Sequence, residues 1–215
     1  MNKYDEWRSN YDQMSYADQI KYSMNFIGDD TLAETRHQLI SDELRQFLIN
    51  ENRINHTHVI FELGGWKGYL ANEILAQFDS SVIWDWYNFD IAIYAMIKTK
   101  CLDPRYNCCI TNKPIWAFMN AISRRILKEA DIFVASHVLE HIKFEELEML
   151  YYRLLDSNCR HLFIDIPVPN ENPNWSNYEG THILEVGYNE IIKLFSQEYN
   201  LIKRNESFTL WGRNN

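Results

Sequence analysis

The sequence has no run of basic residues and no apolar run of membrane-spanning length. Its 215 residues include 21 Lys and Arg against 30 Asp and Glu, which gives a formal net charge of -9. Nucleic acid is not expected as the main partner, because phosphate binding requires clustered cations. The polar start M-N-K-Y-D-E-W has no apolar signal core. We therefore expect a soluble, cytoplasmic protein that has no membrane partner and acts on a small molecule. The sequence does not indicate an oligomeric state.

Cysteine is also scarce, and no C-x-x-C pair is present. The four cysteines are Cys101, Cys108, Cys109 and Cys159. Their spacing argues against a zinc ribbon. Adjacent Cys108 and Cys109 lie in an apolar run, which is typical of small buried side chains in a reducing compartment.

From Thr57 onward, short apolar runs alternate with helical stretches. Strands are predicted at 59–63, 81–85, 107–110, 131–136 and 161–166, and two last runs, L-I-K-R and S-F-T-L-W, suit an antiparallel hairpin. This alternation predicts an α/β fold with a mostly parallel sheet, a C-terminal antiparallel hairpin and helices on both faces. Residues 1–56, where Leu39, Leu44 and Leu48 recur at helical spacing, are predicted to form helices before a main domain at 57–215.

The stretch V-I-F-E-L-G-G-W-K-G-Y (59–69) predicts a strand, a glycine-rich turn and a helix. Gly64, Gly65 and Gly68 would let the backbone turn sharply and approach a ligand. The N–H groups of the following helix would suit a carboxylate or phosphate. Glu62, at the strand end, could accept a hydrogen bond from an ammonium group. A plain tight turn explains the same pattern, so the turn alone does not establish a ligand.

The next predicted strand ends in Asp85. An acid one strand away from such a turn can accept hydrogen bonds from both ribose hydroxyls. Turn and acid together fit a dinucleotide or S-adenosylmethionine. The glycines of G-G-W-K-G (64–68) do not follow the dinucleotide spacing G-x-G-x-x-G.

The stretch E-L-G-G-W-K-G resembles the first motif of class I S-adenosylmethionine-dependent methyltransferases, E/D-x-G-x-G-x-G. Glu62, Gly64 and Gly68 match it, and Trp66 replaces the middle glycine. D-I-F-V-A-S-H-V-L-E-H-I (131–142) resembles the fourth-strand segment of this family, and T-H-I-L-E-V-G-Y-N-E-I-I-K-L-F (181–195) the segment after its fifth strand. The resemblance covers about residues 57–213. It implies the Rossmann-like class I methyltransferase sheet, with residues 1–56 as a helical lid or cap.

The resemblance also implies a cofactor, S-adenosylmethionine, and the residues that bind it. The implied cofactor-binding residues are Glu62, Gly64, Gly65 and Gly68 for the methionine end, Asp85 for the ribose, Trp86 near the adenine, and Ser136. Thr111 and Asn112 are the candidates for the adenine amine.

The segment H-V-L-E-H (137–141) also matches the inverted zinc-protease signature H-x-x-E-H. That signature requires a helix, whereas this segment directly follows a predicted strand. Some members of the methyltransferase family hold a divalent ion with this segment and a later His. Here the corresponding ligands would be His137, Glu140, His141 and His182, and such a nitrogen-rich set would favour zinc, manganese or iron over magnesium. Alternatively, Glu140 and His141 only orient the next helix, so the metal stays open.

A general base assists methyl transfer to a hydroxyl, and His titrates near neutral pH. His137 is the first candidate catalytic residue, His182 the second and His141 the third. We expect methyl transfer to a hydroxyl or amine of a small polar acceptor. A sugar is one option, because the loop at 167–182 is rich in Asn, Trp and Tyr. Two alternatives remain: a metal-assisted RNA methyltransferase, and a non-catalytic binding module whose turn is altered by Trp66.

Overall fold

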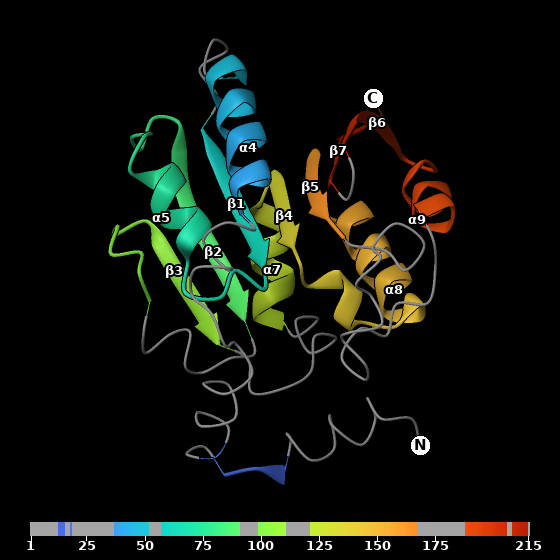
Figure 1. The fold of residues 1–215 in the computed structure, drawn as a ribbon, viewed down its shortest axis with the longest axis horizontal. Helices are drawn as coiled ribbons and strands as arrows, with labels where there is room; N and C mark the ends of the chain where they lie inside the picture. Colours follow the sequence, from blue (N-terminus) through green and yellow to red (C-terminus); the bar gives the residue numbers. More distant parts are fainter. Residues whose placement is uncertain are drawn as a thin grey trace.

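The computed structural model contains a seven-stranded sheet with helices on its two faces (Figure 1). It describes residues 13–15, 18, 37–51, 57–90, 99–110, 121–166, 188–205 and 208–214. The strands are β1 (His58–Leu63), β2 (Ile83–Asp90), β3 (Tyr106–Ile110), β4 (Ile132–Ser136), β5 (His161–Asp165), β6 (Tyr199–Asn205) and β7 (Phe208–Arg213). The helices are α4 (Gln38–Glu51), α5 (Tyr69–Leu75), α7 (Ala121–Glu129), η3 (Leu139–His141), α8 (Phe144–Leu155) and α9 (Tyr188–Phe195).

The strand order is β3-β2-β1-β4-β5-β7-β6. Strands β1 to β5 pair in parallel, whereas β7 pairs antiparallel with both β5 and β6. The predicted mostly parallel sheet with a C-terminal antiparallel hairpin is therefore confirmed.

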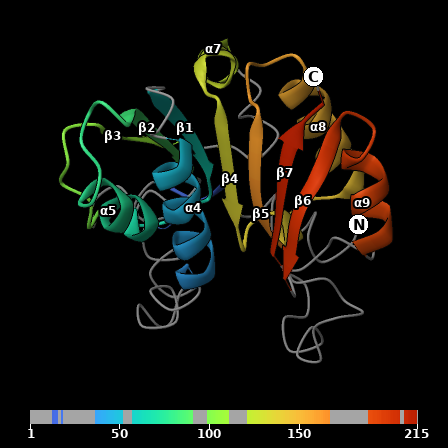
Figure 2. The same cartoon turned by 90° about the horizontal axis from the view of Figure 1, so that it is seen from above.

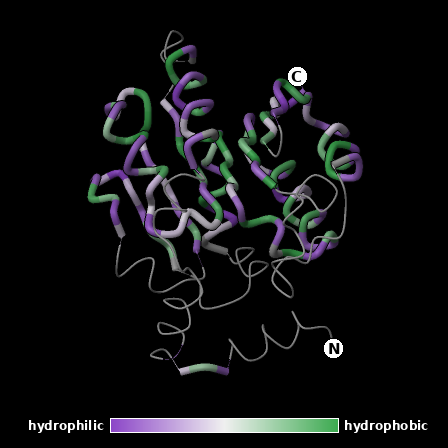
Figure 3. The backbone as a smooth tube through the Cα atoms, in the orientation of Figure 1, coloured by the Kyte–Doolittle hydropathy of each residue, from purple (hydrophilic) through white to green (hydrophobic). Residues whose placement is uncertain are grey.

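Side chains alternate across the strands and form two cores. Ile60, Val134 and Phe163 pack beneath α4 and α5. Their neighbours Phe61 and Phe133 face the other side, where α7, α8 and α9 cover the sheet. Figure 2 shows the helices on both faces, as the sequence predicts. Figure 3 shows hydrophobic and hydrophilic residues alternating around α9, the pattern of a helix with one buried face.

The predicted N-terminal segment, residues 1–56, includes a helix, α4, that packs on the sheet. Ile40, Leu44 and Leu48 of α4 are fully buried and share a core with β1 and β4. Lys203 of β6 also donates a hydrogen bond to Glu43 of α4 at 2.6 Å. Of residues 1–36, only 13–15 and 18 belong to the described part of the chain, so the lid stays a prediction.

Within the described residues, no helix is long and apolar enough to cross a membrane. The cysteines Cys101, Cys108, Cys109 and Cys159 are all free thiols.

Candidate functional site

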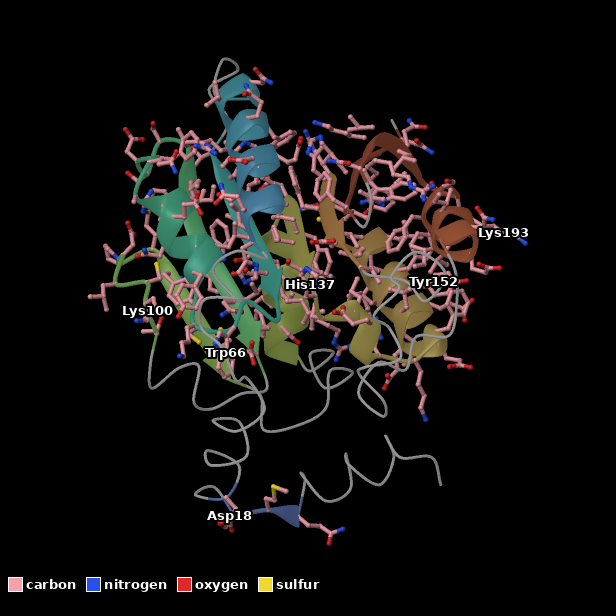
Figure 4. All side chains as sticks on the ribbon, viewed as in Figure 1. Asp18, Trp66, Lys100, His137, Tyr152 and Lys193 are labelled. Carbon is pink, nitrogen blue, oxygen red and sulfur yellow. The ribbon has the colours of Figure 1, made fainter. Side chains whose placement is uncertain are left out.

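The direction in which the chain adds successive strands to the sheet reverses between β1 and β4. From β1 the chain moves outward through β2 and β3, then returns to β4 and continues to β5 on the other side. Ligands of open α/β sheets bind at the carboxyl ends of the strands at such a switch point. The glycine turn follows β1 and His137 follows β4, so both sequence motifs lie at this edge (Figure 4).

The turn between β1 and α5 requires glycine at several positions. Gly64 and Gly68 have φ angles of 70° and 75°, in the left-handed region. A Cβ on Gly64 would lie 2.6 Å from Val138, and one on Gly65 would lie 2.3 Å from the Glu62 carboxyl group. Side chains are therefore excluded, and the backbone itself forms this part of the edge.

Trp66 occupies a left-handed conformation as well, with φ 47°. This conformation costs a non-glycine residue about 1–2 kcal/mol. Two side chains of β2 hold the residue there: its N–H donates to Asp90 Oδ2 at 2.9 Å, and its C=O accepts from Asn88 Nδ2 at 3.1 Å. The Trp66 ring is buried, with the Lys67 ammonium 5.6 Å from its centre. The tight turn therefore persists although tryptophan replaces the family's glycine.

The N–H groups of the turn are largely used within the protein. The internal bonds are Gly64 N to Phe89 O at 2.8 Å, Gly65 N to Asn88 Oδ1 at 2.9 Å, Trp66 N to Asp90 Oδ2 at 2.9 Å and Gly68 N to Gly65 O at 2.9 Å. A pyrophosphate needs such groups as donors. These four N–H groups are therefore not available to an anion, while the expected anion-binding role of the first N–H groups of α5, which begins at Tyr69, stays a prediction.

The second strand extends beyond its predicted end. The sequence predicts an end at Asp85, but β2 runs from Ile83 to Asp90, so Asp85 lies near its start. Asp85 pairs in register with Val59 and accepts from Asn107 Nδ2 at 3.3 Å, away from the turn. The acid at the carboxyl end of β2 is Asp90, which is buried against the turn. The position expected for a ribose-binding acid therefore belongs to Asp90, and the placement of Asp85 there is wrong.

Trp86 also differs from its expected position near an adenine. Its side chain is fully buried in the core beneath α5, with Leu70 and Ile74. Its Nε1 donates to Glu62 Oε2 at 2.8 Å. Trp86 thus supports the turn from below and does not line the strand ends, which corrects the expectation.

Glu62 is the buried acid beneath the turn. It is 1 % exposed, and its Oε1 has no hydrogen-bond partner among the described residues. Burial raises its pKa to about 8; the hydrogen bond from Trp86 lowers the pKa, and the charge of Asp90 raises it further. Glu62 therefore carries a proton at neutral pH in the free protein.

This proton predicts how stability depends on pH. The folded-state pKa of about 8 lies above the ordinary value of 4.5, so between these values only the folded state holds the proton. The free energy of unfolding then falls as pH rises, by up to about 1.4 kcal/mol per pH unit. Glu62→Gln keeps an acceptor for Trp86 and removes the titration. Between pH 5 and pH 8, we expect the free energy of unfolding of the wild type to fall by about 3 kcal/mol more than that of Glu62→Gln.

Urea unfolding at the two pH values measures this difference. Glu198→Gln, at an exposed position after α9, is the matched control and should change with pH like the wild type. An equal pH response of Glu62→Gln and wild type would contradict a buried proton on Glu62.

His137 lies between two buried carboxyl groups. Its Nε2 is 3.3 Å from Asp165 Oδ2 and its Nδ1 is 3.7 Å from Glu140 Oε1. Its backbone N–H donates to Asp165 O at 3.0 Å, and its φ of 51° is left-handed. Burial lowers the pKa of His137, but Asp165 and Glu140 outweigh burial and raise it to about 9. At neutral pH His137 is therefore a cation that must release a proton before it can act as a base.

The candidate metal ligands do not form a visible metal site. Among the described residues, no group of three or more His, Cys, Asp or Glu side chains could hold a metal ion. Both ring nitrogens of His137 face carboxyl groups, so a metal at His137 would have to displace the proton of the imidazolium. The side chain of His141 and all of His182 lie outside the described residues. The expected metal site therefore depends on residues outside the described part of the chain and stays a prediction, and no chemical step is derived through a metal.

Ser136 ends β4 beside this cluster. It pairs in register with Asp165, is 4 % exposed, and its Oγ has no hydrogen-bond partner among the described residues. Its position at the strand end agrees with the geometry expected of a cofactor residue, and the role itself stays a prediction. Thr111 and Asn112 lie outside the described residues.

Three site residues were not predicted: Asn88, Asp90 and Asp165. Each is a buried polar residue at or near the carboxyl end of a strand. The alternation W-D-W-Y-N-F-D (84–90) places Trp86, Asn88 and Asp90 on one face, which could have revealed a longer strand. Asp165 ends the apolar run H-L-F-I-D, where a carboxylate is exceptional unless it has a partner.

Comparison with known sequences finds no family model and no curated protein that matches this chain. Solved structures do match its fold. Magnesium protoporphyrin IX methyltransferase (ChlM) from Synechocystis PCC 6803 with bound SAM is 11 % identical, with a TM-score of 0.62 over 100 % of this chain and 98 % of that chain. The N-methyltransferase NodS from Bradyrhizobium japonicum WM9 is 10 % identical, with a TM-score of 0.54 over 83 % of this chain and 98 % of that chain.

A third match is the methyltransferase domain of bacterial CtHen1-C. It is 12 % identical, with a TM-score of 0.54 over 83 % of this chain and 100 % of that chain. These identities are low, and what the matches share with this chain is the arrangement of the sheet and its helices. The chain therefore has the fold of class I S-adenosylmethionine-dependent methyltransferases.

Proposed function

We propose that this protein is a methyltransferase that uses S-adenosylmethionine and acts on a hydroxyl or amine of a small polar acceptor. The observation that carries the proposal is the chemistry of the glycine turn at the switch point. Its N–H groups at Gly64, Gly65, Trp66 and Gly68 donate within the protein, while buried acids lie beneath it and beside it. Such an edge disfavours a pyrophosphate and places the Asp90 carboxyl group where a ribose could bind.

The turn at Gly64 and Gly65, at the carboxyl end of β1, would hold the methionine end. Asp90 would accept the ribose hydroxyls from the end of β2. Ser136 lies on the opposite side of β1 from β2 and would contact the cofactor from the end of β4. When bound, S-adenosylmethionine supplies an activated methyl group, so the protein needs chiefly to align the acceptor and exclude water.

His137 is the proposed proton-handling residue near the acceptor. It is the most exposed member of its cluster, with 25 % of its side chain accessible, against 2 % for Glu140 and 4 % for Asp165. Its proton leaves only as the pH approaches the raised pKa, or when a bound cation displaces it. His182 and His141 remain alternatives for this role.

A small acceptor is favoured over nucleic acid because the chain carries an excess of acids. A metal-assisted RNA methyltransferase remains the second candidate, and its metal ligands would include His141 and His182, whose side chains lie outside the described residues. A sugar acceptor and a cytoplasmic location are part of the proposal; the free thiols suit a reducing compartment.

Isothermal titration with three ligands tests the proposal. S-adenosylmethionine and S-adenosylhomocysteine should bind in the micromolar range, and NAD should not bind at millimolar concentration. Absence of S-adenosylmethionine and S-adenosylhomocysteine binding at millimolar concentration would refute the enzyme proposal. It would favour a non-catalytic module whose turn Trp66 has altered.

A further inference from the structure

Asn88 of β2 contacts the glycine turn from beneath with every polar atom of its side chain. Its Oδ1 accepts from Gly65 N at 2.9 Å. Its Nδ2 donates to Trp66 O at 3.1 Å and to Tyr106 OH at 2.8 Å. Asn88 is fully buried, so these bonds are made without competition from water.

The bonds of Asn88 fix the backbone at both ends of the two-residue segment formed by Gly65 and Trp66. Asn88 Oδ1 accepts from the N–H of Gly65, and Asn88 Nδ2 donates to the C=O of Trp66. Glycine visits the left-handed region without steric cost, whereas tryptophan does not. A turn with tryptophan at this position therefore needs an external support that a glycine turn would not require.

The same support reaches the third strand. Tyr106 is the first residue of β3, and its hydroxyl accepts a hydrogen bond from Asn88. Its ring lies against Gly68 of the turn. A Cβ on Gly68 would lie 2.6 Å from the Tyr106 hydroxyl. Asn88 and Tyr106 thus hold Gly65, Trp66 and Gly68 from two neighbouring strands.

We propose that Asn88 is a positioning residue for the cofactor, which holds the Trp66 turn in its left-handed conformation so that the backbone at Gly64 and Gly65 fits the ligand. The inference rests on the proposed function, since the ligand is S-adenosylmethionine. Asn88 itself touches the turn and not the ligand. Its loss should therefore weaken binding through the turn, and only while residue 66 has a side chain.

A double-mutant cycle tests this coupling. Asn88→Ala should weaken S-adenosylmethionine binding about tenfold, the effect of losing one to two net hydrogen bonds. The same substitution in a Trp66→Gly background should weaken binding less than about threefold, because glycine needs no support. Affinity is measured by titration, and the midpoint of thermal unfolding is recorded for each variant.

The matched control is Asn107→Ala in β3. The Asn107 side chain donates to Asp85 of the neighbouring β2 and to the nearby Arg105 O, and it bonds to no residue of the turn in the described structure. It should leave cofactor affinity unchanged. Tyr106→Phe removes a single bond to Asn88 and serves if Asn88→Ala does not fold; we expect about a twofold to threefold loss of affinity.

Two results would overturn the inference. One is a lower unfolding midpoint for Asn88→Ala with unchanged affinity, which indicates a purely structural role. The other is an equal loss of affinity on Asn88→Ala substitution whether Trp66 is kept or replaced by glycine.

Failure of the wild type to bind S-adenosylmethionine would refute the proposed function, and hydrogen exchange then tests Asn88 without any ligand. The amide of Gly65, which donates to Asn88, should be protected in the wild type and exchange at least tenfold faster in Asn88→Ala. Unchanged exchange would show that Asn88 does not hold the turn.

Discussion

Asp90→Asn should weaken S-adenosylmethionine binding about 10- to 100-fold, whereas Asp85→Asn should leave it unchanged. Both acids belong to β2, but only Asp90 ends the strand beside the turn. Hydrogen bonds from hydroxyls to a charged carboxylate contribute about 1.5–3 kcal/mol, which corresponds to that range of affinity.

Substitution of Asp90 by asparagine distinguishes a direct effect on ligand binding from an effect on the turn. Asparagine keeps an oxygen that can accept the Trp66 N–H, which Asp90 now does at 2.9 Å. The turn should therefore persist, and the loss should come from the missing charge. Asp90→Ala removes both the negative charge and the acceptor for the Trp66 N–H, so it should weaken binding further.

Titration calorimetry measures the affinity, and thermal unfolding confirms that each variant is folded. Asp85→Asn is a stringent control, because Asp85 is half-buried and contacts Asn107 and the Tyr87 hydroxyl. A larger loss for Asp85→Asn than for Asp90→Asn would show that the ribose site lies elsewhere.

This pair of acids also shows where prediction from the sequence succeeds. The mostly parallel sheet and its C-terminal hairpin follow from the alternation of apolar runs and helical stretches, and the turn follows from glycines whose conformational freedom is a local property. Gly64 and Gly68 indeed have positive φ angles. The glycine turn and the segment around His137 were therefore located correctly at the carboxyl edge.

The end of β2 could not be predicted from local sequence patterns. Asn88 and Asp90 are polar residues that extend the strand because each has a partner in the turn, Gly65 or Trp66, more than twenty residues earlier. A buried polar side chain is stable only with such a partner. Since the partner is defined by the folded sheet, local patterns end the strand at Asp85, its first acid.

Asp165 was missed for a related reason. It follows an apolar run and its partner His137 belongs to the neighbouring strand end, across the β4–β5 pairing. The sequence identifies His137 as a candidate base but contains no local sign of the two carboxyl groups beside it. The charge state of His137 therefore follows only from the folded structure, which brings the two carboxyl groups beside it.

That charge state predicts a second large effect. The folded-state pKa of His137 is about 9, above its ordinary value of 6.5. The group therefore stabilises the fold fully below pH 6.5, and this contribution is lost as the pH rises to about 9. Over that interval the contribution amounts to about 3 kcal/mol. His137→Gln should therefore lower the free energy of unfolding by about 3 kcal/mol more at pH 6 than at pH 9.5.

Urea unfolding of wild type and variant at both pH values measures this. Other titrating groups, Glu62 included, cancel in the difference between the two proteins. A destabilisation by His137→Gln that is equal at both pH values would exclude an imidazolium at this site.

The titration can also be followed directly by NMR of the histidine rings, where His137→Gln assigns the signal. We expect the pKa of His137 to fall by at least about one unit in Asp165→Asn, because an adjacent carboxylate shifts a pKa by about 1–3 units. Glu140→Gln should lower it less, since Glu140 lies 3.7 Å from the ring and Asp165 lies 3.3 Å from it. If His137 accepts the acceptor's proton, these carboxyl groups set the pH at which it can do so: a wild-type His137 gains its free ring nitrogen only towards pH 9, and Asp165→Asn should move that threshold towards neutrality.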